Sequence, residues 1–510
     1  MKLLSLICLA MLAVGVGSQF AHAEDFRFQH EHVLGTSLEL IVAANNKAEA
    51  HQVEQRVLQE IDRQAAIFSR YDAQSELMRW QAGELASTER SPELITVLKR
   101  AEHFRRITNG AFDVRCGALT KLWEDAAQQG QVPTDKVRQT LLSQLVHPPY
   151  QFSDTNQVVR LDTLAISLDG LAKGYILDAV CSVVQNEFRS VNDFTINIGG
   201  DLRKLGDAPL EVSVADPQHT AESARPLEKF VVTQPIAMAT SGDYRRYLEI
   251  AGRRYSHIFD PRSGLPAGEV CSASVVAEIA MDTDALATAL CVLGPAEGIA
   301  LIENLNATEC CLVMRDGRVV RSSGWPLRSQ AAPAQLLVMK EDQKNEDTGL
   351  WVDFSLMRPQ GGRGYRRPYV AIWLEDTDGF PVKTAVLWMQ TEQPGPRWHR
   401  DLTRWYRNDR LRQVVEETEL IGTVSGATRG PGNYDAYFDG TDNAGKPLKP
   451  GQYTLCLEVA REHGSYQLIR EKIDWGNKPI AKKELKGNAE MDKVSYRFVP
   501  AKTEAKTDAS

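Results

Sequence analysis

The chain has 510 residues, an apolar fraction of 43% and a formal net charge of −8. This length exceeds one ordinary domain, so we expect two or three domains, each with enough apolar residues for a packed core. The acidic balance argues against a protein that binds nucleic acid or an anionic membrane surface.

The first 23 residues have the pattern of a secretory signal peptide. Lys2 gives a positive start, residues 3–16 are apolar, and Ala21-His22-Ala23 forms a small-x-small cleavage site. The apolar run is too short for an ordinary membrane-spanning helix. We therefore expect an exported protein whose leader is cleaved. The alternative is that the leader stays in place as an N-terminal anchor.

Seven cysteines follow the predicted cleavage site, with no CxxC spacing and no Cys/His zinc pattern. Most of them lie among apolar residues, which predicts buried free thiols. One disulfide is the alternative in an oxidising compartment. The seven are Cys116, Cys181, Cys271, Cys291, Cys310, Cys311 and Cys456.

The N-terminal part opens with a strand and two helices. Residues 30–44 form a predicted strand, and residues 47–68 form a predicted helix in which apolar side chains recur at helical spacing. Residues 91–108 form a second predicted helix, because Ser91 can cap it and Pro92 suits its first turn.

Farther along the chain, strands and Gly-containing turns alternate with helices. Residues 166–184 predict a strand, a turn and a helix that begins near Ala172, and residues 194–206 predict a strand that ends at a double-Gly bend. A short strand then leads into a helix over residues 282–293. Because hairpins interrupt this alternation, the pattern favours an α+β fold of mixed sheets with helices over residues 24–328.

Residues 240–266 form a predicted β-hairpin with a turn at Ala251-Gly252. The second strand is expected to run through Phe259, which places His257 near the strand end and just before a loop, where proteins often present catalytic side chains. With a carboxylate such as Asp260 nearby, this imidazole could act as a general base. A packed structural histidine is the alternative.

Asp284 and Thr288 are four residues apart on one predicted helix, so their oxygens meet on one face. A carboxylate with a hydroxyl suits Mg²⁺, which often binds through few protein ligands together with phosphate. Asp282 could cap the same helix. The alternative is that these residues are ordinary capping and surface groups.

Two Gly-containing bends add to this chemistry. Glycines at Asp169-Gly170, Lys173-Gly174 and Gly199-Gly200 would let the backbone approach a phosphate, and a helix N-terminus after Gly170 would favour an anion. Neither bend is a Walker loop or a GxGxxG fingerprint. Together with Asp284 and His257, the bends indicate phosphoryl or nucleotidyl transfer with Mg²⁺ and one acid/base histidine.

The C-terminal part has a different pattern of predicted elements. Residues 329–347 form a predicted linker, and residues 348–475 contain short alternating strands split by Gly, Pro and Asp turns, which predicts an Ig-like β-sandwich domain. Residues 476–510 are rich in Lys, Glu and Ala and are predicted to form a disordered tail.

Eight motifs in the N-terminal part resemble those of the ApbE family, the periplasmic FAD:protein FMN transferases. The resemblance spans roughly residues 30–325 and implies an ApbE-like fold and a periplasmic location. The motifs are LGT (34–36), FSRYDAQSEL (68–77), NGAFDV (109–114), DGLAKGY (169–175), NIGGD (197–201), ATSGDYRRY (239–247), YSHIFDPRSGLP (255–266) and DTDALATAL (282–290).

The resemblance implies a Mg²⁺-dependent reaction with FAD. A Thr or Ser hydroxyl of an exported redox protein attacks the FMN-side phosphorus, AMP leaves, and FMN stays attached through a phosphoester. The metal ligands implied are the carbonyl of Ala172, Asp284 and Thr288, and His257 is the implied base. The implied FAD contacts are Leu34, Tyr71, Ala111, Phe112, Asp113, Asp169, Tyr175 and Ile258. The family usually has Met where Leu34 stands, a similar apolar side chain.

Residues Ser425-Gly426-Ala427-Thr428 resemble the S/T-G-A-T-like motif of acceptor proteins, whose last Thr receives FMN. Flavinylation of Thr428 by this chain or by another copy is therefore a hypothesis, and a small-residue turn is the alternative. The Asp common upstream in acceptors is absent here. The C-terminal part also resembles a small periplasmic domain found with flavin-linked redox proteins, which implies peripheral association with inner-membrane redox complexes.

Three functions remain open from the sequence. The first is a flavin transferase that acts on exported proteins. The second is a Mg²⁺-dependent FAD pyrophosphatase that makes FMN and AMP, which differs only in whether water reaches the phosphorus. The third is a non-catalytic flavin-binding or electron-carrying protein. Asp284, Thr288 and His257 favour the first two.

Overall fold

The computed structural model describes residues 24–500 except 86–89, 154–156, 219–225, 244–246, 327–347, 359–366, 390–400, 417–424, 427, 462–464, 477 and 488–489. The predicted signal peptide and linker lie outside the described residues.

An eight-stranded sheet forms the centre of the N-terminal part, and every neighbouring pair in it is antiparallel. In spatial order its strands are β1 (Glu24–Val33), β2 (Thr36–Ala44), β5 (Phe194–Ile198), β6 (Asp201–Leu205), β9 (Ile236–Gly242), β12 (Val270–Ala277), β13 (Glu309–Met314) and β14 (Val319–Arg321). Smaller antiparallel pairs are β3 (Tyr150–Phe152) with β4 (Val158–Arg160) and β7 (Leu210–Val214) with β8 (Glu228–Val232).

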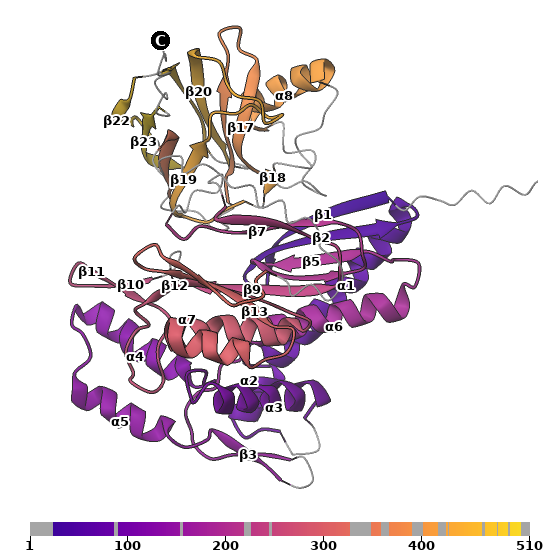
Figure 1. Ribbon diagram of the computed structural model, residues 1–510, viewed down its shortest axis with the longest axis vertical. Coiled ribbons are helices and arrows are strands. Elements are labelled where there is room, and N and C mark those ends of the chain that lie inside the picture. The colour runs from indigo at the N-terminus through magenta and orange to yellow at the C-terminus, as the bar shows by residue number, and fades with distance from the viewer. Residues whose placement is uncertain are drawn as a thin grey trace, which may run out of the picture.

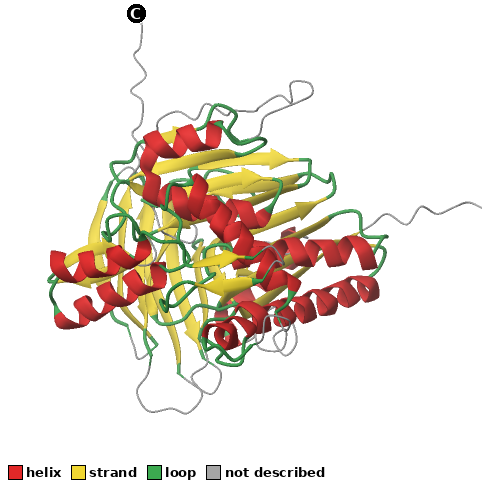
Figure 2. Cartoon of the chain, turned by 90° about the horizontal axis from the view of Figure 1, so that it is seen from below, coloured by secondary structure: helices red, strands yellow, loops and turns green. Residues whose placement is uncertain are grey.

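Helices cover one side of this sheet, and the C-terminal sheets lie on the other side (Figure 1). Seen from below, the helices stand in front of the strands (Figure 2). Side chains from the sheet and from α1, α6 and α7 form one large core. The helices are α1 (Lys47–Phe68), α2 (Glu76–Gln81), α3 (Pro92–Ile107), α4 (Cys116–Gln129), α5 (Asp135–Leu145), α6 (Ala172–Glu187) and α7 (Ala280–Glu303).

Local signals in the sequence explain several helix starts. The hydroxyl of Ser91 accepts a hydrogen bond from the N–H of Leu94, and Pro92 is the first residue of α3, as predicted. Among the described helices, α7 is long and apolar enough to cross a membrane by length and composition. Half of its most apolar window is buried in the core, however, and it is broken at Gly294 (φ 73°).

The predicted hairpin forms from β10 (Tyr247–Ile250) and β11 (Arg253–Ser256). Ala251 and Gly252 have φ values of 50° and 77°, which suit a two-residue hairpin turn. The expected second strand is too long, because β11 ends at Ser256. The N–H of Ile258 turns back to the hydroxyl of Ser256 at 3.1 Å, so His257 lies in a bend.

The C-terminal part consists of a four-stranded sheet, β19-β15-β23-β22, and a five-stranded sheet, β18-β17-β16-β20-β21. Both sheets contribute side chains to one core, so they pack face to face. The prediction of a C-terminal domain built from strands is confirmed, the Ig-like arrangement stays a prediction, and α8 (Thr403–Glu416) is an addition that was not predicted. The strands are β15 (Gly349–Leu356), β16 (Tyr369–Glu375), β17 (Pro381–Trp388), β18 (Ser425–Gly426), β19 (Gly432–Phe438), β20 (Gly451–Ala460), β21 (Tyr466–Trp475), β22 (Ile480–Leu485) and β23 (Met491–Val499).

The prediction of a disordered tail from residue 476 is wrong for most of its length. β23 pairs along β15 and buries Val494, Tyr496 and Phe498 in the sandwich core. The charged residues that suggested disorder belong to β22, which lies at the sheet edge and is largely exposed. Edge strands commonly carry lysines.

All seven described cysteines are free thiols, and six of them are buried, as predicted. Cys116 is half-buried. Burial raises the pKa of these thiols, so they are poor nucleophiles.

Candidate active site

The first turns of α6 and α7 meet at Gly174. The Asp284 carboxylate accepts a hydrogen bond from the N–H of Gly174 at 3.1 Å. A Cβ at Gly174 would lie 2.2 Å from the carbonyl oxygen of Ala280, so this close approach requires glycine. Burial raises the pKa of Asp284 to about 7, and the nearby Lys173 opposes this shift.

Lys173 brings a second carboxylate to the same place. Its ammonium forms an ion pair with Asp201, which follows the Gly199-Gly200 bend. Burial would lower the pKa of Lys173, but Asp201 and Asp284 outweigh it and the pKa is raised. The cluster thus holds two carboxylates and one ammonium. When Asp284 is ionised the cluster carries one net negative charge, which favours a bound cation.

Thr288 lies one turn after Asp284 on α7. Its hydroxyl is 3.1 Å from the hydroxyl of Ser241 at the end of β9. A Cβ at Gly170 would lie 3.6 Å from the Thr288 hydroxyl and 3.2 Å from the ring of Phe112. The turn before α6 therefore comes close to Thr288, and only a residue without a side chain fits easily between the hydroxyl and the ring.

These residues fit a Mg²⁺ site. A carboxylate, a hydroxyl and the backbone carbonyl of Ala172, at the start of α6, are hard oxygen ligands. Within the residues that the structure describes, no group of three or more His, Cys, Asp or Glu side chains could hold a metal ion. A cation here would therefore depend on one carboxylate, neutral oxygens and the substrate's phosphates.

Asp282 does not cap α7, contrary to expectation. Its carboxylate forms an ion pair with Arg100 on α3. The cap is instead Asp178 of α6, which accepts hydrogen bonds from the N–H groups of Ala280 and Met281 at 3.0 and 2.9 Å. The capping carboxylate comes from more than 100 positions away, and local spacing gives no signal of it.

Three of the predicted flavin contacts, Leu34, Tyr71 and Asp169, are exposed. Tyr71 is 79% exposed, and the guanidinium of Arg70 lies 4.6 Å from its ring centre. Arg70 also pairs with Asp169 at 2.6 Å. Leu34 is 37% exposed at the β1–β2 turn, with a φ of 50°. Exposed aromatic and apolar side chains beside a polar turn can receive a flat ligand.

Other predicted flavin contacts are buried or half-buried. Ala111 and Phe112 are buried. Tyr175 meets Phe68 edge to face at 5.4 Å, and Ile258 packs against the main core. These side chains are apolar or aromatic, so the polar contacts must come from other groups.

Asp113 lies in a buried ion pair. Both of its oxygens accept hydrogen bonds from Arg115, at 2.9 and 2.7 Å, and Arg115 is fully buried. Arg115 also donates to Asp162 and to the carbonyl of His147, each at 2.7 Å. The carboxylate of Asp113 thus fixes the loop after α3. Any contact between Asp113 and the flavin would therefore come from the backbone of Asp113.

His257 is half-buried and lies between two anchored aromatic residues. Tyr255 and Phe259 both pack against Trp123 of α4, at 5.3 and 5.8 Å between ring centres. The Asp260 carboxylate, expected beside the imidazole, pairs with Arg262 at 2.9 Å. The aromatic contacts therefore hold the backbone on either side of His257.

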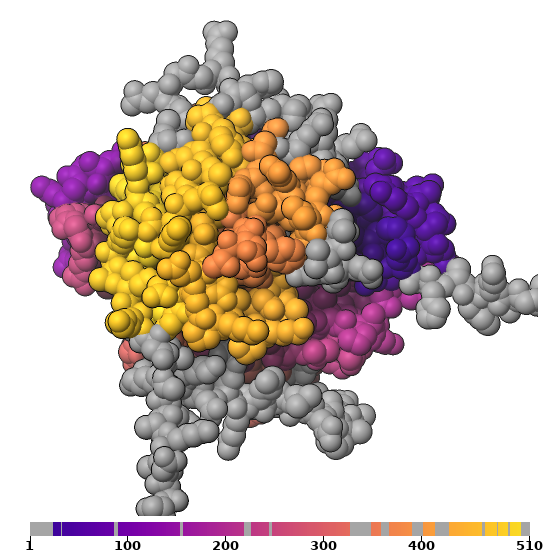
Figure 3. All heavy atoms as spheres, turned by 90° about the horizontal axis from the view of Figure 1, so that it is seen from above, coloured from indigo at the N-terminus to yellow at the C-terminus, as the bar shows by residue number. Residues whose placement is uncertain are grey.

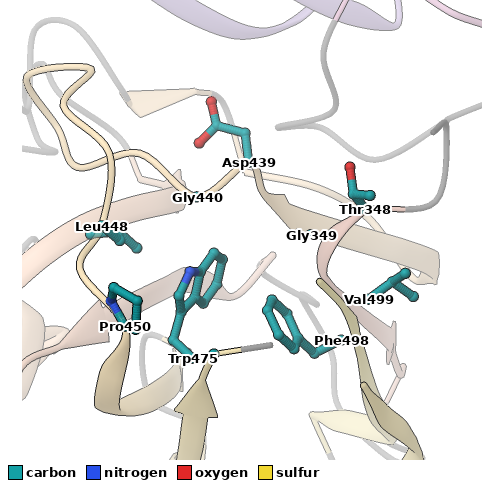
Figure 4. Close-up of a pocket in the computed structure, with 10 residues that line it drawn as sticks. Thr348, Gly349, Asp439, Gly440, Leu448, Pro450, Trp475, Phe498 and Val499 are labelled. Atoms are coloured by element: carbon teal, nitrogen blue, oxygen red, sulfur yellow. The ribbon is translucent and has the colours of Figure 1, made fainter. Parts of the chain in front are cut away.

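The sequence interpretation missed the Lys173–Asp201 ion pair and the role of Ser241. Lys173 lies in the motif DGLAKGY, Asp201 in NIGGD and Ser241 in ATSGDYRRY, and membership of these motifs was their only signal. A separate cavity of about 240 Å³ opens at one end of the C-terminal sheets, far along the chain from these motifs (Figure 4). It is lined by Thr348, Gly349, Asp439, Gly440, Leu448, Pro450, Trp475, Gly476, Phe498 and Val499.

A model of the ApbE family matches residues 34–312, more than half of the chain. The chain belongs to the ApbE family. A second family model, described as a predicted periplasmic protein (DUF2271), matches residues 352–493. The ApbE match contains the candidate site, and the second match lies within the C-terminal sheets.

Individual ApbE relatives agree with this placement. The chain is 32% identical over 260 residues to a FAD:protein FMN transferase of Vibrio cholerae, which covers 49% of this chain and 74% of that protein. A FAD:protein FMN transferase of Haemophilus influenzae is 28% identical over 311 residues, or 56% of this chain and 83% of that protein. The crystal structure of the ApbE protein of Thermotoga maritima superposes with a TM-score of 0.51 and 28% identity, over 59% of this chain and 97% of that one.

Proposed function

We propose that this ApbE protein transfers FMN from FAD to a Thr or Ser hydroxyl of exported redox proteins and releases AMP. The observation that carries the proposal is the buried carboxyl of Asp284, held by the N–H of Gly174 one helical turn before Thr288, whose hydroxyl lies close to Gly170. Relatives named FAD:protein FMN transferase support it. The leader pattern and the second family's description support a periplasmic location.

The chain's own groups would bind FAD along the turn before α6. In the first turn of α6 the N–H of Ala172 donates to the carbonyl of Leu168 and that of Gly174 to Asp284, so the helix dipole, more than free N–H groups, would favour the pyrophosphate. Leu34 and Tyr71 would hold the flavin at an exposed rim, and Phe112, Tyr175 and Ile258 would form a wall. Mg²⁺ at Ala172, Asp284 and Thr288 would neutralise charge on the pyrophosphate.

His257 would take the proton of the attacking hydroxyl. The hydroxyl oxygen forms a bond to the FMN-side phosphorus as the bond from that phosphorus to the bridging oxygen breaks. AMP leaves with the bridging oxygen. Because His257 lies in the bend after β11, it need not share the strict alternation of a strand with Ile258, and the two can serve acceptor and flavin respectively.

The test offers the mature protein FAD, Mg²⁺ and an exported acceptor protein with an S/T-G-A-T-like motif. AMP release that requires the acceptor, and that stops when the motif Thr is replaced by Val, supports the transferase. AMP and free FMN at the same rate without acceptor would instead identify a pyrophosphatase.

Thr428 stays a predicted acceptor within this chain. Its side chain is only 3% exposed, and its hydroxyl donates a hydrogen bond to Glu31. Flavinylation would therefore require this contact to open. Mass spectrometry of the C-terminal peptide after incubation with FAD and Mg²⁺ tests it, and an unmodified Thr428 under conditions that modify a separate acceptor excludes it. Peripheral association with inner-membrane redox complexes likewise stays a proposal.

A further inference from the structure

A hydrogen-bonded contact joins the C-terminal sheets to β1. The backbone N–H and the hydroxyl of Thr428 donate to the two carboxylate oxygens of Glu31, each at 2.5 Å. Figure 1 shows the C-terminal sheets above the N-terminal sheet, with β18 close to the level of β1, and the view from above shows the C-terminal part lying over the N-terminal part (Figure 3). Hydrogen bonds to an ionised carboxylate are among the stronger ones in proteins.

Thr428 is fixed firmly on its own side of the contact. Its carbonyl accepts a hydrogen bond from Arg367 at 3.2 Å. Just before it, β18 pairs with the end of β17, and just after it the carbonyl of Gly430 accepts from Tyr434 at 2.8 Å. Thr428 therefore moves with the C-terminal sheets, and not as an independent loop residue.

Glu31 sits on an irregular part of β1. The register with β2 shifts between His30 and Val33, which is a β-bulge. On the other side of the strand, the imidazole of His30 lies 2.8 Å from the carboxylate of Glu54 on α1. β1 is thus held from both sides at the bulge, by α1 through His30 and by the C-terminal sheets through Glu31.

The bulge leads directly into the turn that carries Leu34. Leu34 and Gly35 have φ values of 50° and 80°, and a positive φ is unusual for leucine. Such a conformation persists only when its surroundings fix it. Thr36, at the end of this turn, lies against Gly199, where a Cβ would be 2.7 Å from its hydroxyl. Asp201, the partner of Lys173, is two residues farther on.

We infer that Glu31 and Thr428 are positioning residues for the flavin site, through which the C-terminal sheets hold the Leu34 turn in its binding conformation. The inference rests on the proposed function, because it is the proposed function that makes Leu34 a flavin contact. It gives the C-terminal part a role in FAD binding without any contact to FAD.

The test compares three variants of the full mature chain. Thr428→Val loses the hydroxyl bond, Thr428→Ser keeps both bonds, and Thr441→Val is the matched control. Thr441 also lies in the C-terminal part and donates its hydroxyl to a carboxylate, that of Asp439 at 2.8 Å. FAD affinity is measured by flavin fluorescence with EDTA present, so that no turnover occurs, and amide hydrogen exchange is followed over residues 31–36.

We expect Thr428→Val to weaken FAD binding about 3- to 10-fold and to speed exchange over residues 31–36. Thr428→Ser and Thr441→Val should match the wild type in both measurements. Equal FAD affinity and exchange in wild type and Thr428→Val would overturn the inference. A wild-type chain that binds FAD neither with EDTA nor with Mg²⁺ present would instead overturn the proposed function and, with it, the inference.

Discussion

The carboxylate of Asp284 accepts its hydrogen bond from the backbone N–H of Gly174, and this bond ties the first turn of α7 to the first turn of α6. Lys173, the neighbour of Gly174, pairs with Asp201 on β6. Two consecutive residues thus hold two carboxylates from different elements. The candidate metal site depends on this arrangement more than on the spacing of Asp284 and Thr288 along one helix.

Gly174→Ala should disrupt the site through packing. The new Cβ would lie 2.2 Å from the Ala280 carbonyl oxygen, so the two helices must separate. We expect a loss of about 1–3 kcal/mol in the free energy of unfolding and weaker Mg²⁺ binding, measured by denaturant titration and calorimetry. Gly117→Ala in α4 is the control, because its Cβ would be 4.0 Å from the nearest atom. Equal stability and Mg²⁺ affinity in the two variants would contradict the account.

Asp201→Asn should release Lys173 from its ion pair. The freed ammonium would then turn to Asp284 and compete with a bound cation. We expect roughly tenfold weaker Mg²⁺ binding, which corresponds to about 1.4 kcal/mol. Asp282→Asn is the control, since Asp282 pairs with Arg100 and should affect stability alone. Unchanged Mg²⁺ affinity in a folded Asp201→Asn protein would argue against a role for this pair in cation binding.

Asp113→Asn separates a structural role from a flavin contact. Removing one partner of a buried ion pair is strongly destabilising, by about 3–5 kcal/mol, because Arg115 would stay buried with less compensation. We expect this loss in denaturation experiments, and little change in FAD affinity at temperatures where the variant is folded. The opposite result, normal stability with FAD binding weakened tenfold or more, would make the carboxylate a direct flavin contact.

The C-terminal sheets should lose stability in acid through Glu375. Burial acts to raise the pKa of Glu375, but hydrogen bonds and charge from Arg404 and Arg470 outweigh it, and the pKa falls below its ordinary 4.5. The unfolded chain then binds the proton more readily than the folded one. The stabilisation is present above pH 4.5 and is lost as the pH falls through the lowered pKa. The denaturant midpoint of the wild type should fall as the pH is lowered below 4.5, and that of Glu375→Gln should fall less. An equal dependence of the midpoint on pH in the two proteins would contradict this prediction.

Local patterns predicted local structure well. The Ser91-Pro92 start of α3 and the Ala251-Gly252 turn both follow from rules that involve a few neighbouring residues. The end of β11 was placed three residues too late, because the alternation of Tyr255, His257 and Phe259 continues through a bend that the Ser256 hydroxyl stabilises. The alternation of side chains along a sequence gives no information about such a side-chain hydrogen bond.

Contacts between distant segments explain what the sequence did not predict. Composition suggested a disordered tail, but β23 forms because β15, more than 130 residues earlier, supplies its partner and its core. The capping of α7 by Asp178 and the docking of Thr428 on Glu31 are of the same kind. Helical spacing pointed to Asp284 and Thr288 as candidate metal ligands and the family resemblance added the Ala172 carbonyl, whereas the charges that surround them became visible only in the fold.

The central claim is transfer of FMN to a protein hydroxyl with His257 as the base. Its most direct measurement is mass spectrometry of an acceptor protein incubated with FAD, Mg²⁺ and the mature chain, with AMP quantified in the same sample. We predict one FMN per motif Thr, matched by AMP, and a rate lower by about 10²- to 10⁴-fold in His257→Ala, while His147→Ala keeps the wild-type rate. AMP without FMN on the acceptor, or full transfer by His257→Ala, would contradict the account.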